Sequence, residues 1–294
     1  MITFVRNVSL AVALCAVLAG CGGTSGSGTS GGARPAAPER PAGAAAPSPA
    51  GTPPAMAPGP GGLTPVFARG PATAGKTVAL TFDADMTADQ GPRAARGERF
   101  DNPALIDTLR RLKVDATVFM TGRWAEEYPD QARAIGNDPR FEIANHSYSH
   151  HAFKAPCYGL PTLARPDMAA DVRRAFDAFR TAGARNVVPY FRFPGGCHDD
   201  EALRALATTR VTAVQWDVVG GDAFATDADA VAEQVLAGVT PGSLVVLHCT
   251  RSAAPVTERA IRRIVPELRE RGYRFVKVSE LMATTGRDPR ADLR

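Results

Sequence analysis

From Lys76 onward the chain alternates regularly between two kinds of segment. Short runs rich in β-branched and aromatic residues have the character of strands: TVALTFD, ATVFMT, FEIAN, VPYFRF, TAVQWDV, SLVVLHC and YRFVKV. Between them lie PALIDTLRRLKV, WAEEYPDQARAIG, MAADVRRAFDAFRTAG, DEALRALATTR, DAVAEQVLAGV and TERAIRRIVPELRERG. The last four carry apolar residues at i, i+3 and i+4, the spacing of a helix with one buried face. This alternation predicts an α/β fold, with a parallel sheet covered by helices and closed, or nearly closed, into a barrel.

Side chains capable of acid–base or metal chemistry gather where the predicted strands end. They are Asp83 and Asp85 at the first strand, His146 and His150 after the third, Arg192 at the fourth, Asp217 and Asp222 after the fifth, and His248 at the sixth. In β/α barrels the carboxyl ends of the strands form the functional face. The sequence therefore predicts that these residues share one face.

Two of the chain's five histidines, His146 and His150, are four residues apart in NHSYSHH. On a helical turn they would project from one side and could share a metal ion. Two histidines and one carboxylate are typical of a catalytic zinc site. We therefore expect a divalent cation, most simply Zn²⁺, with one carboxylate of Asp83 and Asp85 as the third ligand and the other as a base. A protease motif of the H-E-x-x-H type is excluded because residue 147 is serine.

Arg192 and His248 are the remaining candidates for the chemistry. Arg192 stands between two aromatic residues in FRFPGG, which predicts an inward-facing side chain paired with the base carboxylate. His248 in VVLHC can act as a general acid. Asp222 is the carboxylate expected to keep it protonated, with Asp217 as the alternative.

Residues 76–282 resemble the polysaccharide deacetylases, the carbohydrate esterases of family four that share the NodB-homology domain. The motifs that carry the resemblance are TFDAD, HSYSH, RFPGG, WDVVGGDAF and VLHC, in this order. The resemblance implies a distorted (β/α) barrel of seven to eight strands that holds a divalent metal, usually zinc. It also implies hydrolysis of N- or O-acetyl groups on glycans.

The resemblance implies a role for each matching residue. Those roles are general base for Asp83, metal ligand for His146 and His150, orientation of the base for Arg192, tuning of the acid for Asp222 and general acid for His248. The backbone N–H of Gly195 would help to stabilise the oxyanion. Leu247 would line the pocket for the acetyl methyl group.

The first motif departs from the family pattern, because Ala84 stands where the family's metal-binding aspartate follows the base. Side chains alternate along a strand, so Asp83 and Asp85 share a face while Ala84 points away. We therefore assign Asp85 to the metal and Asp83 to the base, with exchanged roles as the alternative. A second departure is Cys249, where the family commonly has aspartate.

The N-terminal residues predict export. In residues 1–21, Arg6 precedes an apolar core of roughly 13 residues, which suits a secretory signal better than a membrane span. The ending LAGC resembles a bacterial lipobox, so we expect Cys21 to be lipidated; a plain signal peptide is the alternative. Residues 22–75 are rich in Gly, Ala, Pro, Ser and Thr and are expected to form a disordered tether. Residues 283–294 are expected to be a C-terminal tail.

Export also permits a disulfide. Beyond Cys15 and Cys21 the chain contains Cys157, Cys197 and Cys249. We expect Cys157 to pair with Cys197, because both follow active-face motifs, and the rival pair is Cys197 with Cys249.

The charge of the chain excludes little on its own. The net charge is only +4, and no cluster of Lys and Arg with interleaved aromatic residues favours nucleic-acid binding.

Together these features predict a zinc-dependent hydrolase anchored by lipid to the extracytoplasmic face of the cell membrane. It would remove N-acetyl groups from an envelope glycan, with peptidoglycan N-acetylglucosamine as the expected substrate. The alternatives are an esterase that removes O-acetyl groups from xylan or another polysaccharide, and a catalytically inactive relative that binds cell-wall glycan.

Overall fold

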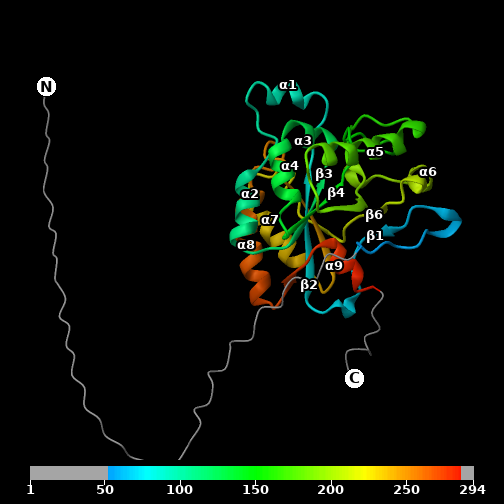
Figure 1. The fold of residues 1–294 in the computed structure, drawn as a ribbon. Helices are drawn as coiled ribbons and strands as arrows, with labels where there is room; N and C mark the ends of the chain where they lie inside the picture. Colours follow the sequence, from blue (N-terminus) through cyan, green and yellow to red (C-terminus); the bar gives the residue numbers. More distant parts are fainter. Residues whose placement is uncertain (1–51, 286–294) are drawn as a thin grey trace, which may run out of the picture. The chain divides into compact units, whose positions relative to one another are not determined.

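A single sheet of parallel strands forms the centre of the structure, a computed structural model that describes residues 52–285 (Figure 1). The strands are β1 (Val66–Phe67), β2 (Thr77–Ala84), β3 (Ala116–Met120), β4 (Phe141–Asn145), β5 (Val187–Phe191), β6 (Thr212–Val214), β7 (Val218–Val219), β8 (Ser243–His248) and β9 (Arg274–Phe275). Their order is β1-β6-β5-β4-β3-β2-β8-β7, and β9 pairs with β2. The predicted parallel sheet of a distorted (β/α) barrel is confirmed, but the barrel is not closed, because β1 and β7 end the strand order without pairing with each other.

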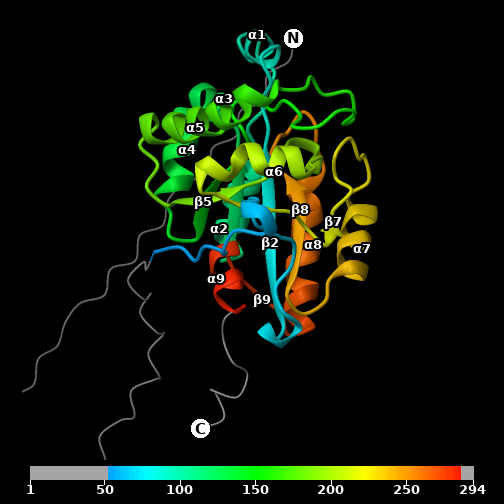
Figure 2. The same cartoon turned by 90° about the vertical axis from the view of Figure 1, so that its right-hand side faces the viewer.

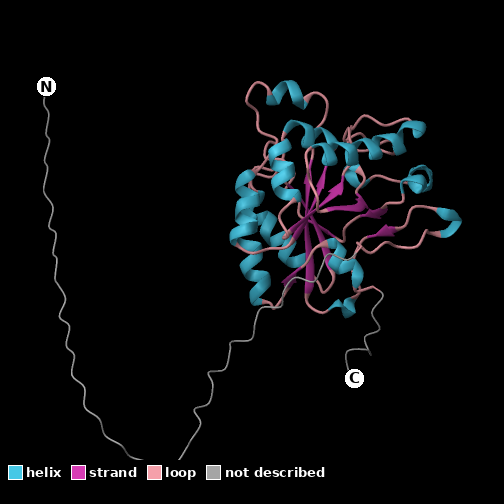
Figure 3. Ribbon diagram, in the orientation of Figure 1, coloured by secondary structure: helices cyan, strands magenta, loops and turns pink. Residues whose placement is uncertain are grey.

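The described residues form nine α-helices. They are α1 (Gln90–Ala94), α2 (Pro103–Arg111), α3 (Gly122–Glu127), α4 (Pro129–Gly136), α5 (Arg165–Thr181), α6 (Asp200–Leu206), α7 (Ala228–Gly238), α8 (Thr257–Glu270) and α9 (Val278–Ala283). Most of them lie around the sheet, whereas α1 stands beyond its end (Figure 3). Several of the helices begin at a residue whose side chain caps the helix. The carboxylate of Asp227, for example, accepts from the backbone N–H groups of Asp229 and Ala230 in α7. Figure 2 shows β2 as the long central strand, with α7 and α8 on one side and α3, α4 and α5 on the other.

The central strand is buried on both faces, which explains its nearly continuous apolar run. Leu80 and Phe82 belong to a helix-side cluster, between the sheet and helices that include α2, α7 and α8. Ala79 belongs to an inner cluster, on the opposite face of the sheet. Because side chains alternate, Asp83 follows Ala79 onto the inner face. The first carboxylate of the candidate site is thus directed to the inside of the incomplete barrel.

The run TAVQWDV, expected to be one strand, forms two strands in different places. β6 pairs with β5 and β1, whereas β7 pairs with β8. Between them, Gln215 N donates to Phe67 O at 2.8 Å, on the β1 side, and Asp217 N donates to Leu244 O at 3.2 Å, on the β8 side. Three residues therefore connect the two sides of the sheet without a continuous ladder between them.

The run YRFVKV is also shorter as a strand than expected, because helix α9 begins at Val278. The buried carboxylate of Glu142 holds the start of this helix. Its Oε1 accepts from Ser279 N at 3.0 Å and from Thr117 Oγ1 at 2.8 Å, and its Oε2 accepts from Ser279 Oγ at 2.6 Å. Thr117 Oγ1 in turn accepts from Val278 N at 2.9 Å.

The predicted tether of residues 22–75 extends too far toward the C-terminus. In residues 52–75, β1 pairs with β6, and Phe67 is only 3% exposed within the inner cluster. Tyr190 also donates through its hydroxyl to Pro54 O at 2.9 Å. The few bulky residues of this segment thus find partners on the sheet that composition alone does not reveal.

The predicted signal segment, the lipobox with Cys21 and residues 22–51 of the tether lie outside the described residues, as do residues 286–294 of the predicted tail. Within residues 52–285, none of the helices has the length and apolar character needed to span a bilayer.

Candidate active site

The carboxyl ends of the strands bring the predicted residues together. Asp83 on β2 lies directly opposite His248 on β8 in the parallel register. His146 follows β4 and Arg192 follows β5, and the backbone N–H of Arg192 donates to Asn145 O at 2.8 Å. In Figure 1 this is the upper end of the sheet, where β2 leads toward α1.

Asp85, His146 and His150 form a cluster that can hold a metal ion. One ligand atom from each lies within 4.8 Å of the others. Asp85 Oδ1 lies 3.3 Å from His146 Nε2 and 3.7 Å from His150 Nε2. These are the three residues that the sequence assigns to the metal, so the predicted cluster is present.

The loop that carries the histidines is not the helical turn that their spacing suggested. Ser147 and His150 both have left-handed backbone conformations, with φ of +68° and +57°. Asn145 Oδ1 accepts from Ser147 N at 2.8 Å, and Ser147 Oγ accepts from His150 N at 2.9 Å. Asp171 Oδ1, on α5, accepts from Tyr148 N at 2.7 Å. Hydrogen bonds from side chains therefore stabilise a non-helical turn. This turn, and not a helical one, brings both imidazoles next to Asp85.

Several contacts show that this cluster suits a cation. Asp85 Oδ1 is buried and, among the described residues, has no hydrogen-bond donor. His146 Nδ1 donates to the backbone oxygen of Arg192 at 2.9 Å, so a neutral imidazole has its lone pair on Nε2, which faces Asp85. Such a meeting of lone pairs is repulsive unless a positive charge lies between them. The Asp–His–His donor set therefore fits a divalent metal.

The pKa shifts show that the cluster attracts positive charge. Burial lowers the pKa of His146, but Asp83 and Asp85 outweigh it and the net shift is upward. Burial lowers the pKa of His150 to about 4, so this imidazole is neutral at pH 7 and free to act as a ligand. Burial raises the pKa of Asp85, but the charges of His150, His146 and His248 outweigh it, and the net shift is strongly downward.

Asp83 makes a different set of contacts. Its Oδ1 accepts from Arg192 Nη1 at 2.6 Å, while its Oδ2 lies 3.7 Å from His146 Nε2. The guanidinium of Arg192 is fully buried, packs over the ring of Phe119 at 3.8 Å and donates through Nε to Val214 O at 3.3 Å. Burial lowers the pKa of Arg192, against the opposing charge of Asp83. The predicted inward pairing of Arg192 is confirmed.

His248 and Asp222 form a second ion pair beside the cluster. His248 Nδ1 lies 2.9 Å from Asp222 Oδ1, and Asp222 Oδ2 accepts from His248 N at 2.7 Å and from Thr257 Oγ1 at 2.6 Å. Burial lowers the pKa of His248, but the hydrogen bond and charge of Asp222 raise it to about 10. Asp217, the alternative partner, instead accepts from Leu244 N at 2.6 Å, near the opposite end of β8.

Leu247 does not line the acetyl pocket as predicted. It belongs to the helix-side cluster, and a Cβ on Gly220 would lie 2.3 Å from its Cδ2. Alternation along β8 puts Leu247 and His248 on opposite faces. Val246, buried and two residues before His248, is the apolar side chain on the catalytic face, and the period of the strand could have identified it.

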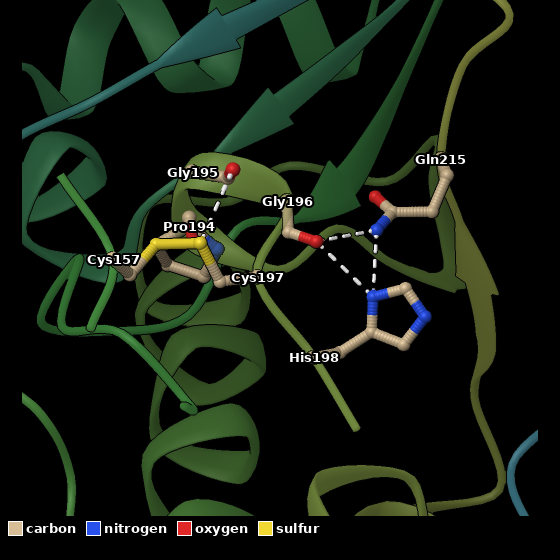
Figure 4. Close-up of a disulfide and its surroundings, with 7 residues drawn as sticks. All are labelled: Cys157, Pro194, Gly195, Gly196, Cys197, His198 and Gln215. Atoms are coloured by element: carbon tan, nitrogen blue, oxygen red, sulfur yellow. Dashed lines mark hydrogen bonds between the residues drawn. A yellow bond between two sulfur atoms is a disulfide. The ribbon is translucent and has the colours of Figure 1, made fainter. Parts of the chain in front are cut away.

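Gly195 lies in the turn after β5, and its conformation requires glycine. Its φ is +64°, and an added Cβ would lie 2.7 Å from Cys157 Sγ. The close neighbour is the disulfide between Cys157 and Cys197, which is the predicted pair (Figure 4). This disulfide joins the loop after the histidines to the loop after Arg192.

Cys249 is a free, buried thiol of the helix-side cluster. Burial raises its pKa to about 12. It is therefore neither a partner of Cys197 nor part of the metal-binding cluster.

Thr250, which no motif in the sequence indicates, supports Asp85 through the backbone. Thr250 Oγ1 accepts from Asp85 N at 2.8 Å and lies 3.3 Å from Asp85 O. Thr257 and Asp171, which hold Asp222 and the histidine loop, were missed for the same reason. Each lies far along the chain from the residue it supports, and none has a motif of its own.

Comparisons with known proteins agree with this geometry. A family model described as polysaccharide deacetylase matches residues 70–214. The chain is 30% identical over 211 residues to a chitooligosaccharide deacetylase of Sinorhizobium fredii, covering 68% of this chain and 89% of the relative. It is 28% identical over 211 residues to a peptidoglycan-N-acetylglucosamine deacetylase of Bacillus cereus, covering 71% and 69%.

Solved structures show a similar fold. A family 4 carbohydrate esterase from Streptomyces lividans, in complex with acetate, has a TM-score of 0.55 and 26% identity, covering 68% of this chain and 91% of that chain. The family match includes the strands that carry Asp83, His146 and Arg192, while Asp222 and His248 follow it in the chain.

Proposed function

Because the chain belongs to the polysaccharide deacetylase family, we propose that it removes N-acetyl groups from a cell-envelope glycan, with peptidoglycan N-acetylglucosamine as substrate. One observation carries this proposal: the same end of the sheet holds an Asp–His–His cluster, a carboxylate paired with arginine and a histidine paired with aspartate. The three parts correspond to a metal site, a base and an acid.

The metal would be held by Asp85, His146 and His150, with Zn²⁺ as the expected ion. When bound, a divalent cation acidifies water and offsets negative charge that develops on the acetyl oxygen. Asp83 approaches the cluster only at His146, where Oδ2 lies 3.7 Å from Nε2, and its Oδ1 forms an ion pair with Arg192. This difference supports Asp85 as ligand and Asp83 as base over the exchanged assignment.

In the proposed reaction, Asp83 accepts a proton from the attacking water, and Arg192 keeps the carboxylate pointed at it. The backbone N–H of Gly195 donates to the oxygen that becomes negatively charged. His248 donates its proton to the departing nitrogen, and Asp222 orients the imidazole through Nδ1 so that Nε2 is the donor. The products are acetate and a free amine on the sugar.

The protonated state of His248 favours an amide over an ester as the substrate. An amine leaves as an anion only at great cost, so it must receive a proton, whereas an alkoxide leaves more readily. A pKa raised to about 10 keeps that proton available at neutral pH. Relatives named as deacetylases of chitooligosaccharide and of peptidoglycan N-acetylglucosamine also support an N-acetyl substrate.

The test measures acetate released from N-acetylated peptidoglycan and from O-acetylated xylan by the purified protein. We expect faster release from peptidoglycan, loss of activity after chelation and recovery with Zn²⁺. Faster release from xylan would make the protein an O-acetyl esterase. Binding of peptidoglycan without release of acetate from either polymer would indicate an inactive, glycan-binding relative.

We also propose that the protein is exported and anchored by lipid at Cys21, so that residues after it tether the catalytic domain to the extracytoplasmic face of the membrane. The support is the lipobox-like LAGC and the preceding apolar core. Cys21→Ser should release the protein from the membrane fraction of the host cell. Retention in the membrane would contradict the anchor.

A further inference from the structure

Two aromatic side chains near the active site stand almost fully in water. Tyr158 is 88% exposed and Phe224 is 83% exposed. Among the described residues the other exposed large hydrophobic side chains are Met56 and Val219, neither of them aromatic. Leaving a ring of this size in water forgoes about 1.5–3 kcal/mol of burial. A partner that covers the rings would recover it.

The backbone at both residues is left-handed, which is unusual for large side chains. The φ angle is +45° at Tyr158 and +60° at Phe224. Each such conformation costs roughly 1–2 kcal/mol and persists only where neighbouring contacts impose it. Phe224 N donates to Ala253 O at 2.6 Å, and the disulfide of Cys157 holds the residue before Tyr158. The backbone that carries each ring is therefore held by a contact with another loop.

Both rings are carried by segments next to residues of the candidate active site. The Cδ2 atom of Tyr158 lies 3.1 Å from the position that a Cβ would take on Gly195. Phe224 stands two residues after Asp222, the partner of His248. The Tyr158 loop is tied to the exit of β5, and Phe224 follows β7. In the sheet order, the strands β4, β2 and β8, which lead to His146, Asp83 and His248, lie between these two.

Isolated, fixed rings suit one kind of partner. A pyranose has a face of C–H groups that packs on an aromatic ring while its hydroxyls stay hydrated at the rim. A protein or lipid surface would instead need a contiguous apolar patch. We propose that Tyr158 and Phe224 are stacking sites for sugar units on either side of the unit being deacetylated, so that the protein prefers a glycan strand over a single sugar. This inference rests on the proposed function and adds that the substrate must contain sugar units beside the one that is deacetylated.

The test uses asparagine, because asparagine tolerates the left-handed backbone better than alanine. Tyr158→Asn and Phe224→Asn are compared with Met56→Asn, a matched change at a residue that is 37% exposed on the segment beside β6. The substrates are the hexamer of N-acetylglucosamine and 4-nitrophenyl acetate. The ester reports the chemistry alone, and the ratio of the two values of kcat/KM reports the stacking.

We expect each active-face variant to lose about tenfold in kcat/KM for the hexamer. Activity on the ester should stay within about twofold, and Tyr158→Phe should behave as wild type. Equal losses on hexamer and ester, or no loss on the hexamer beyond that of Met56→Asn, would overturn the stacking sites.

Failure of the proposed function would look different, because wild type would then release no acetate from any glycan. Calorimetric titration with the hexamer still decides the inference in that case. Binding by wild type that weakens about tenfold in Tyr158→Asn or Phe224→Asn supports it. Equal binding by all variants, or no binding by wild type, refutes it.

Discussion

Replacing Asp222 with asparagine should move the alkaline limit of activity to lower pH. Asp222 raises the pKa of His248 to about 10, whereas burial alone would lower it from 6.5. The substitution removes this charge and leaves the burial, so the pKa of His248 should fall toward its ordinary value of about 6.5, with the charges of Asp85 and Asp83 still opposing the burial. Because the protonated imidazole is the active form of a general acid, activity falls as pH rises through this pKa.

The expected size of the effect follows from these two values. The difference between about 10 and 6.5 corresponds to about 5 kcal/mol, at about 1.4 kcal/mol for each pKa unit. This is an upper bound, since the His248 side chain is 24% exposed and a nearby cation would lower both pKa values. With a pKa of 6.5, about one His248 in ten stays protonated at pH 7.5 and about one in a hundred at pH 8.5.

The assay is the dependence of kcat/KM on pH, from pH 5.5 to pH 10.5, for wild type and Asp222→Asn. The control is Asp217→Asn, which removes a carboxylate that bonds to Ser243 Oγ and Leu244 N and not to His248. We expect the control to keep the wild-type profile. The variant should lose activity steeply above about pH 6.5. A variant whose activity is lower by the same factor at every pH would refute the proton-holding role of Asp222.

Three further predictions concern the metal, the anchor of α9 and the disulfide. Asp85→Asn should weaken Zn²⁺ binding, measured by calorimetry, by at least about tenfold. Asp83→Asn should bind Zn²⁺ nearly as wild type and release no acetate. The opposite result would exchange the roles of the two aspartates. Glu142→Ala should lower the free energy of unfolding in urea by about 3 kcal/mol, because the buried hydroxyl of Thr117 and two groups of Ser279 lose their acceptor. Unchanged stability would refute the anchor. Cys197→Ser should lower the same quantity by about 4 kcal/mol for a closed loop with a sequence separation of 40, and a variant as stable as the oxidised protein would contradict this estimate.

The positions of the candidate site residues could be predicted because they depend on short-range rules. Parallel strands bring their carboxyl ends to one edge, so Asp83, His146 and His248 had to lie at the same end of the sheet. The alternation of side chains put Asp85 on the same face as Asp83. The same alternation contradicts the prediction for Leu247, which came from the family resemblance and not from the strand.

The parts that could not be predicted depend on contacts between distant residues. The left-handed conformation of His150 comes from bonds to Ser147 and from the support of Asp171, on a helix that begins fifteen residues later at Arg165. The ordered segment around Phe67 depends on pairing with β6, far along the chain. The composition of this segment predicted disorder, because composition does not reveal that a distant strand, β6, has an edge with which the segment can pair.

The charges of the site explain how it can both bind a cation and, with the cation bound, stabilise an anionic transition state. The carboxylates of Asp83, Asp85 and Asp222 bring three negative charges, and Arg192 and protonated His248 bring two positive ones. With His146 and His150 neutral, as metal ligands must be, the net charge is −1, and such a charge in a largely buried site favours a cation. A divalent ion changes it to +1, and such a site then stabilises the negative charge that develops on an acetyl oxygen more than it stabilises the neutral substrate. Stronger binding of the transition state than of the ground state is what catalysis requires.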